Sequence, residues 1–168
     1  MKLNKEDFEL IEIAKGVLKD NEDLYPQKDT IVAAVVKASS GKIYKGINIK
    51  TSHSICSEQV ALGQALASGE RTIDTIVAVK LNKDGSMRVV SPCGLCRYTF
   101  DKLNINANII VEDVEKDIVL KVKSKELLPY PYKRENDWCR FLFANQETST
   151  LNKISYLRNV WIKQMFMI

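Results

Sequence analysis

Three cysteines and one glutamate, divided between two short segments, constrain the fold of this chain most. The first segment is Cys56-Ser57-Glu58 and the second is Pro92-Cys93-Gly94-Leu95-Cys96, and each begins a stretch that favours a helix. Two cysteines three residues apart on the first turn of a helix project from the same side, so their thiolates can share one tetrahedral metal ion. A Cys-x-x-Cys motif on its own remains ambiguous, because redox pairs and structural zinc sites use the same spacing.

Cys56 favours a catalytic metal site, because it adds a third thiolate at the start of a different helix. Three protein ligands leave the fourth position of a zinc ion open, which is typical of catalytic rather than structural zinc. Glu58 lies too close to Cys56 in sequence to be an easy co-ligand. We expect it to act as a proton shuttle, which takes a proton from the attacking water and passes it to a ring nitrogen and a departing amine.

The rest of the chain predicts an α/β sandwich, with helices on both faces of a mixed sheet. Hydrophobic periodicity predicts a helix over residues 5–19, and a β-branched run interrupted by Ser-Ser-Gly-Lys predicts a hairpin over residues 30–49, whose first strand is buried on both faces. Further along we expect, in order, a helix over 56–69, a strand over 75–81, a short extended segment over 87–90, a helix over 93–103, strands over 107–111 and 118–122, and a short helix over 125–128.

Length and composition narrow the functional classes. The 168 residues fit one zinc-binding domain, expected over residues 1–136, and a C-terminal extension of unclear structure over residues 137–168. The net charge of +4 comes from scattered lysines without interleaved aromatic residues, which disfavours nucleic acid as a partner. Acidic residues near the N-terminus and the lack of a long apolar run argue against a signal peptide and a membrane span. We therefore expect a cytoplasmic protein without disulfides.

The two cysteine segments together resemble the cytidine deaminase superfamily, specifically the small homotetrameric cytidine deaminases and the blasticidin S deaminases. The match extends from about residue 5 to residue 133. It implies a five-stranded α/β/α sandwich, Zn²⁺ bound by Cys56, Cys93 and Cys96, and Glu58 as the proton shuttle. It also implies a homotetramer or homodimer that hydrolyses the 4-amino group of a cytosine nucleoside, or of a cytosine nucleoside antibiotic such as blasticidin S, to a uracil product and ammonia.

Four further residues are candidate substrate contacts. By the resemblance, Asn48 matches an asparagine that contacts the sugar and base, and the backbone carbonyl of Ser91 would meet the leaving ammonia. Tyr132 follows the Glu-Leu-Leu-Pro segment, at the place of an aromatic that closes over a neighbouring subunit's site. His53 lies in the loop before Cys56, where it is either a substrate contact or a solvated residue. The alternative for Asn48 is a polar residue at a strand end, and the alternative for Tyr132 is an ordinary surface or interface tyrosine.

Several positions around the expected pocket depart from cytidine deaminases. Lys50 replaces a glutamate that binds the ribose 3′-hydroxyl, Asp29 stands near the place of a stacking aromatic, and Gln59 replaces an arginine that helps to neutralise the thiolates. The loop over residues 48–56 is also shorter and closer in length to that of blasticidin S deaminases. We therefore expect blasticidin S or a similar aminoacyl-nucleoside to be as favoured a substrate as cytidine.

Some alternatives stay open at the level of sequence. The chain could be a noncatalytic, zinc-stabilised binding module, although a structural site has no need of an unliganded carboxylate such as Glu58 beside the metal. Arg97 could add a positive charge beside the thiolates or be a solvated surface arginine. Cys139 lies outside the signature, and its default interpretation is a small buried or exposed thiol.

Overall fold

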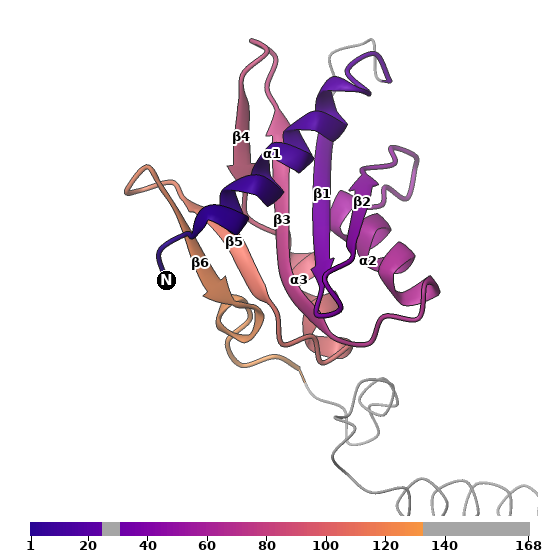
Figure 1. Cartoon of the computed structure of the whole chain (residues 1–168), viewed down its shortest axis with the longest axis vertical. Helices are drawn as coiled ribbons and strands as arrows, with labels where there is room; N and C mark the ends of the chain where they lie inside the picture. Colours follow the sequence, from indigo (N-terminus) through magenta and orange to yellow (C-terminus); the bar gives the residue numbers. More distant parts are fainter. Residues whose placement is uncertain (25–30, 133–168) are drawn as a thin grey trace, which may run out of the picture.

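The computed structural model describes residues 1–24 and 31–132 of the chain, so Asp29, Cys139 and the extension over residues 137–168 lie outside the described residues. Helices and strands alternate along the chain as the sequence predicts (Figure 1). In chain order the elements are α1 (Lys5–Lys19), β1 (Ile31–Ala38), β2 (Ile43–Ile47), α2 (Ser57–Ala67), β3 (Ile73–Leu81), β4 (Met87–Val90), α3 (Gly94–Lys102), β5 (Asn108–Asp113), β6 (Ile118–Lys123) and the 3₁₀ helix η1 (Ser124–Leu127).

The strands form one mixed sheet in the order β2-β1-β3-β5-β6. Only the β3–β5 pair within this order is parallel, and the other neighbours are antiparallel. The five expected strands are therefore present. β4 adds a sixth, because a tight turn, in which the Asn82 amide donates to the Ser86 carbonyl over 2.8 Å, folds it back onto the end of β3. The expected lead into the second cysteine segment is thus a member of the sheet.

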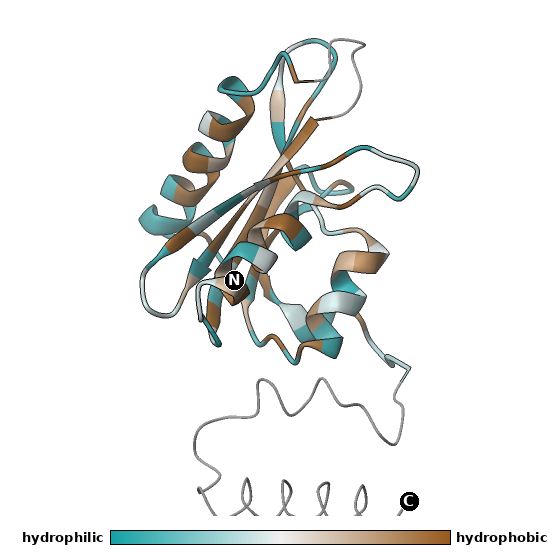
Figure 2. Ribbon diagram, turned by 90° about the vertical axis from the view of Figure 1, so that its right-hand side faces the viewer, coloured by the Kyte–Doolittle hydropathy of each residue, from teal (hydrophilic) through white to brown (hydrophobic). Residues whose placement is uncertain are grey.

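Helices cover both faces of the sheet, which confirms the predicted sandwich. α1 lies on one face, while α2 and α3 lie on the other (Figure 1). β1 contributes to both cores, since Ala33 and Val35 pack on the side of α1 and Ala34 and Val36 pack on the side of α2 and α3. This strand is buried along most of its length, as its apolar run predicts, and Figure 2 shows the apolar residues concentrated in the sheet.

Gly46 permits an unusually close approach between β2 and α2. A Cβ atom at this position would lie 2.4 Å from the carbonyl oxygen of Ser57 and 2.5 Å from the amide nitrogen of Ala61. Both contacts are backbone atoms of α2, which no side-chain rotation can move away. The absence of a side chain at Gly46 therefore sets the height of the first turns of α2 above the sheet.

No helix among the described residues is long and apolar enough to cross a membrane.

Candidate functional site

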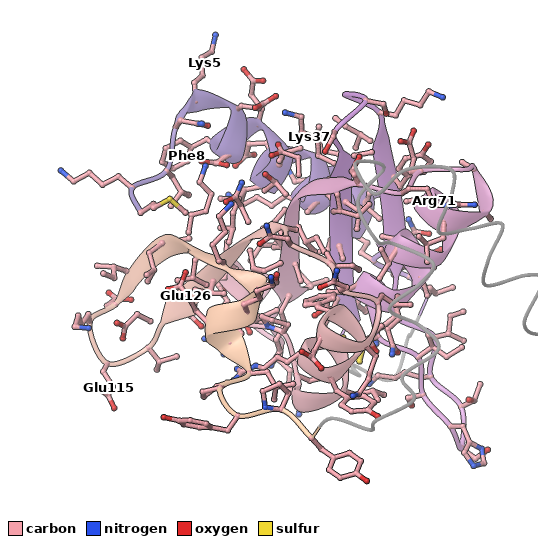
Figure 3. The ribbon with its side chains drawn as sticks, turned by 90° about the horizontal axis from the view of Figure 1, so that it is seen from below. Lys5, Phe8, Lys37, Arg71, Glu115 and Glu126 are labelled. Carbon is pink, nitrogen blue, oxygen red and sulfur yellow. The ribbon has the colours of Figure 1, made fainter. Side chains whose placement is uncertain are left out.

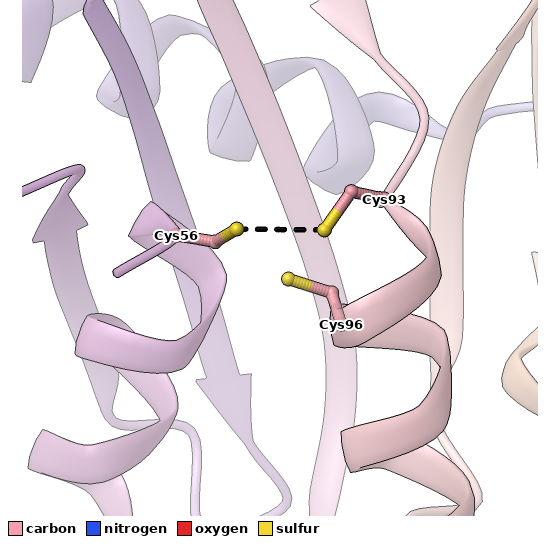
Figure 4. Close-up of side chains that lie close together, drawn as sticks. All are labelled: Cys56, Cys93 and Cys96. Atoms are coloured by element: carbon pink, nitrogen blue, oxygen red, sulfur yellow. Dashed lines mark hydrogen bonds between the residues drawn. The ribbon is translucent and has the colours of Figure 1, made fainter. Parts of the chain in front are cut away.

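The three signature cysteines converge although 37 residues separate the first from the second. Cys56 is the N-cap residue of α2, Cys93 is the N-cap residue of α3, and Cys96 lies on the first turn of α3. The Sγ atoms of Cys56 and Cys93 are 3.4 Å apart, and all three sulfur atoms lie within 4.8 Å of one another (Figure 4). Zn–S bonds of about 2.3 Å in tetrahedral geometry would place sulfur atoms about 3.8 Å apart, so this donor set fits a zinc ion.

Two local interactions hold the segments that lead into the N-termini of α2 and α3. A short antiparallel bridge between Ile49 and Ile55, with N–O distances of 3.0 and 2.9 Å, closes the loop immediately before Cys56. On the other side, Arg97 donates from Nε to the carbonyl oxygen of Pro92 over 2.8 Å. This bond braces the turn that carries Cys93, so Nε of Arg97 serves the backbone rather than a sulfur atom.

Burial, the neighbouring charges and hydrogen bonds to the sulfur atoms together set the pKa values of the three thiols. Burial, followed by the interactions with Cys93, raises the pKa of Cys56 to about 11. The pKa of Cys96, which is completely buried, is also raised, first by burial and then by the negative charges of Glu58, Cys56 and Cys93. Burial acts in the same direction on Cys93, but the backbone amides of Cys96 and Leu95 and the neighbouring thiols outweigh it and lower its pKa. The start of α3 therefore favours the thiolate of Cys93.

Glu58 is a buried carboxylate on the first turn of α2, with 6% of its surface exposed. The hydroxyl of Ser57, which is fully buried, donates to Oε2 of Glu58 over 3.1 Å. The negative charge of Glu58 contributes to the raised pKa values of Cys56 and Cys96, after burial as the largest cause. Glu58 is therefore close enough to act electrostatically on the thiols, which is the position that a proton shuttle beside a metal needs.

Asn48 and Ser91 are both tied to the sheet. The amide of Val32 in β1 donates to Oδ1 of Asn48 over 2.9 Å, and the amide of Asn48 donates to the carbonyl of Val32 over 3.0 Å. Ser91 follows β4 and donates its hydroxyl to the carbonyl oxygen of Glu112 in β5 over 3.1 Å. These bonds fix the side chain of Asn48 at the end of β2 and the backbone of Ser91 two residues before Cys93.

His53 and Tyr132 lie at the surface of the described chain. His53 is exposed in the turn before Cys56, where its Nδ1 lies 3.3 Å from the hydroxyl of Ser52. Tyr132 is 69% exposed as a residue, while its carbonyl oxygen accepts a hydrogen bond of 2.7 Å from Nζ of Lys102 at the end of α3. Within residues 1–24 and 31–132, both residues are exposed rather than enclosed.

Three residues that shape this site, namely Gly46, Ser57 and Thr99, were not predicted from the sequence to contribute to it. A glycine inside a strand is a signal of close backbone approach, so Gly46 was detectable. The hydroxyl of Thr99, which accepts a hydrogen bond of 3.0 Å from Nε2 of Gln59, gave no such signal, because the two residues are 40 positions apart.

Comparisons with known proteins agree with this geometry. Residues 4–112 match the family model "Cytidine and deoxycytidylate deaminase zinc-binding region". A blasticidin-S deaminase from Bacillus cereus is 31% identical over 139 residues, which cover 79% of this chain and 96% of that protein. A cytidine deaminase from Shewanella sediminis is 35% identical over 83 residues, which are 46% of this chain and only 25% of that longer protein.

Solved structures share the fold. A cytidine deaminase from Bacillus anthracis superimposes with a TM-score of 0.65 at 20% identity, covering 82% of this chain and 97% of its own. One from Burkholderia pseudomallei gives a TM-score of 0.60 at 24% identity, covering 77% and 100%. The expected α/β/α sandwich is confirmed by these neighbours as well as by the sheet itself.

Proposed function

Because the chain belongs to the cytidine and deoxycytidylate deaminase family, we propose that it hydrolyses the 4-amino group of a cytosine nucleoside or of a cytosine nucleoside antibiotic of the blasticidin S type. The products are the corresponding uracil compound and ammonia. The observation that carries this proposal is the convergence of three thiols at two helix N-termini, with the buried carboxylate of Glu58 beside them.

The four residues of the signature have two roles, metal binding and proton transfer. Cys56, Cys93 and Cys96 hold Zn²⁺, which when bound supplies a Lewis acid that makes water nucleophilic near neutral pH. The carboxylate of Glu58 would take one proton from the attacking water and deliver it to N3 of the cytosine ring. It would then take the second proton from the new hydroxyl on C4 and pass it to the departing amine, which leaves as ammonia. Burial of Glu58 keeps bulk water away from these transfers, and the hydroxyl of Ser57 fixes the direction of its carboxylate.

The residues around the metal support a substrate other than plain cytidine. The blasticidin-S deaminase of Bacillus cereus aligns over nearly its whole length, and Lys50 stands where a carboxylate would serve a ribose hydroxyl. Asn48, with its carboxamide oxygen held by β1, is proposed to contact the sugar or base, and the carbonyl of Ser91 to accept the leaving ammonia. His53 is proposed as a contact for a group that extends out of the pocket, because it lies in the exposed loop.

We further propose that the protein works in the cytoplasm as a homotetramer or homodimer. The exposed Tyr132 supports this assembly, since an aromatic there can close over the site of a neighbouring subunit only if a second copy is present. Residues 1–136 form the zinc domain in this proposal, and residues 137–168 an extension. Sedimentation equilibrium of the full chain measures the state directly, and a monomer at micromolar concentration would contradict it.

Ultraviolet absorbance with cytidine, deoxycytidine and blasticidin S tests the activity. We expect the zinc-loaded protein to convert at least one of them, and Glu58→Gln to lower kcat by at least about 100-fold while zinc remains bound. Glu115→Gln is the matched control, because Glu115 is exposed and lies in the turn between β5 and β6 (Figure 3). If no substrate is converted, the substrate assignment fails. If Glu58→Gln leaves turnover unchanged, Glu58 is not the shuttle.

A further inference from the structure

A side-chain hydrogen bond joins α2 to α3 between Gln59 and Thr99. Nε2 of Gln59 donates to Oγ1 of Thr99 over 3.0 Å. The hydroxyl proton of Thr99 goes to the carbonyl oxygen of Leu95, 2.9 Å away on the same helix. Because the hydroxyl proton of Thr99 is used in the bond to Leu95, its oxygen can only accept from α2. Gln59 is therefore the donor to Thr99, and Thr99 is the donor to Leu95.

The bond lies one helical turn behind the ligand sulfurs on both sides. Gln59 is three residues after Cys56, and Thr99 is three residues after Cys96, so each partner shares a helix face with a ligand. A helix is stiff over one turn, which means that a fixed distance between Gln59 and Thr99 is passed on to the two helix starts. The bond therefore acts on the separation between Cys56 on α2 and the cysteine pair on α3.

Both partners are half-buried, which makes this bond more than a surface contact. The side chain of Gln59 is neutral and extends to the neighbouring helix, so it adds no positive charge that would offset the three thiolates. Its contribution to the metal site is positional.

We propose that Gln59 and Thr99 are a positioning pair that holds the N-termini of α2 and α3 at the separation at which the three thiols share one zinc ion. The inference rests on the zinc site of the proposed function but not on any substrate. Metal affinity tests it, so that failure of the pair and failure of the deaminase assignment give different results.

The experiment measures zinc affinity by competition with a chromogenic chelator for wild type, Gln59→Ala, Thr99→Val and the double variant. Each single substitution is expected to lower the affinity by about 10- to 100-fold, as is typical when a group that orients metal ligands is removed. The double variant is expected to lose no more than the worse single variant, because both substitutions remove the same bond. Thr99→Ser keeps the hydroxyl and should bind zinc nearly as wild type does.

Three measurements separate positioning from general destabilisation. Gln64→Ala, an exposed glutamine on the same helix, is the matched control and should bind zinc normally. Co²⁺ titration follows the sulfur-to-metal absorption band, which should weaken or shift in Gln59→Ala and Thr99→Val but not in Gln64→Ala. Thermal unfolding with chelator present should be similar for all variants. Wild-type zinc affinity in both single variants, multiplicative losses in the double variant, or equal loss of metal-free stability would each overturn the proposal.

Discussion

Replacing Gly46 with alanine should damage the site from a position on a different element. The added Cβ would lie 2.4 Å from the Ser57 carbonyl oxygen, 2.5 Å from the Ala61 amide nitrogen and 3.0 Å from the Ala61 Cβ. Ordinary van der Waals contacts of carbon begin at about 3.4 Å, so the gap between β2 and α2 must open by about 1 Å. No flexible side chain can absorb this shift, because the two shortest contacts are to backbone.

The shift has two consequences of different size. Forcing a methyl group into a closely packed place costs about 1–3 kcal/mol, which corresponds to a Tm lower by about 2–12 °C for a domain of this length. Ser57 directly precedes Glu58, and α2 also begins at Cys56, so the same movement displaces the carboxylate and one metal ligand. A misplacement of about 1 Å at a reacting group can cost about 100-fold in rate. The loss of activity should therefore exceed what the loss of folded protein explains.

Gly63→Ala is the control variant, because Gly63 lies on α2, the helix that Gly46→Ala displaces, and alanine there should not reduce stability or activity. Gly63 is exposed, and a Cβ there would meet no atom within 4 Å. Alanine in a helix interior is favoured over glycine by about 0.5–1 kcal/mol, so this variant should be slightly more stable and fully active. Both variants are compared by thermal unfolding, zinc content and kcat/KM at a temperature at which each is folded. Wild-type Tm and kcat/KM in Gly46→Ala would refute the close-approach argument.

The remaining predictions concern stability and metal binding. Lys121→Met should lower the free energy of unfolding by about 3 kcal/mol, because Nζ of Lys121 lies 2.7 Å from Oδ2 of Asp7 and the substitution leaves that buried carboxylate without its cation. Lys5→Met, at a lysine that projects into solvent (Figure 3), should change stability by less than about 0.5 kcal/mol, and urea unfolding distinguishes the two. The apparent zinc affinity should rise with pH: the pKa of Cys56 is raised to about 11 and that of Cys96 is raised too, so both thiols carry protons near neutral pH and zinc must displace them. Chelator competition between pH 6 and pH 8 should show an increase of about 10- to 100-fold per pH unit, and a flat profile would contradict protonated thiols.

The order of the elements could be predicted from the sequence because it depends on local patterns. Both cysteine segments do begin helices, with Cys56 and Cys93 as N-cap residues, and the apolar run of β1 is buried on both faces. The bounds are less well determined by pattern, since β3 begins at Ile73 and the expected short helix is the 3₁₀ helix η1. The membership of β4 in the sheet depends on pairing with β3, which hydrophobic periodicity in four residues cannot specify.

The contacts that shape the site were harder to predict because they join distant positions. Gln59 and Thr99 are 40 residues apart, and Lys121 and Asp7 are 114 residues apart, so no local pattern links either pair. Gly46 is the exception, because a glycine within a strand is visible in sequence. The sequence does not show which element approaches Gly46, and the fold reveals that it is α2.

The charge of the metal site gives these contacts their importance. Three thiolates would leave a bound zinc ion with a net negative centre, and the residue directly after Glu58 is the neutral Gln59. Nε of Arg97 is bonded to the carbonyl of Pro92. Compensation therefore comes in part from the backbone of α3, whose first amides lower the pKa of Cys93 against the opposing effect of burial. Backbone amides stabilise a thiolate only in a fixed orientation, so this site depends on the placement of its helices more than a site neutralised by a mobile cation would.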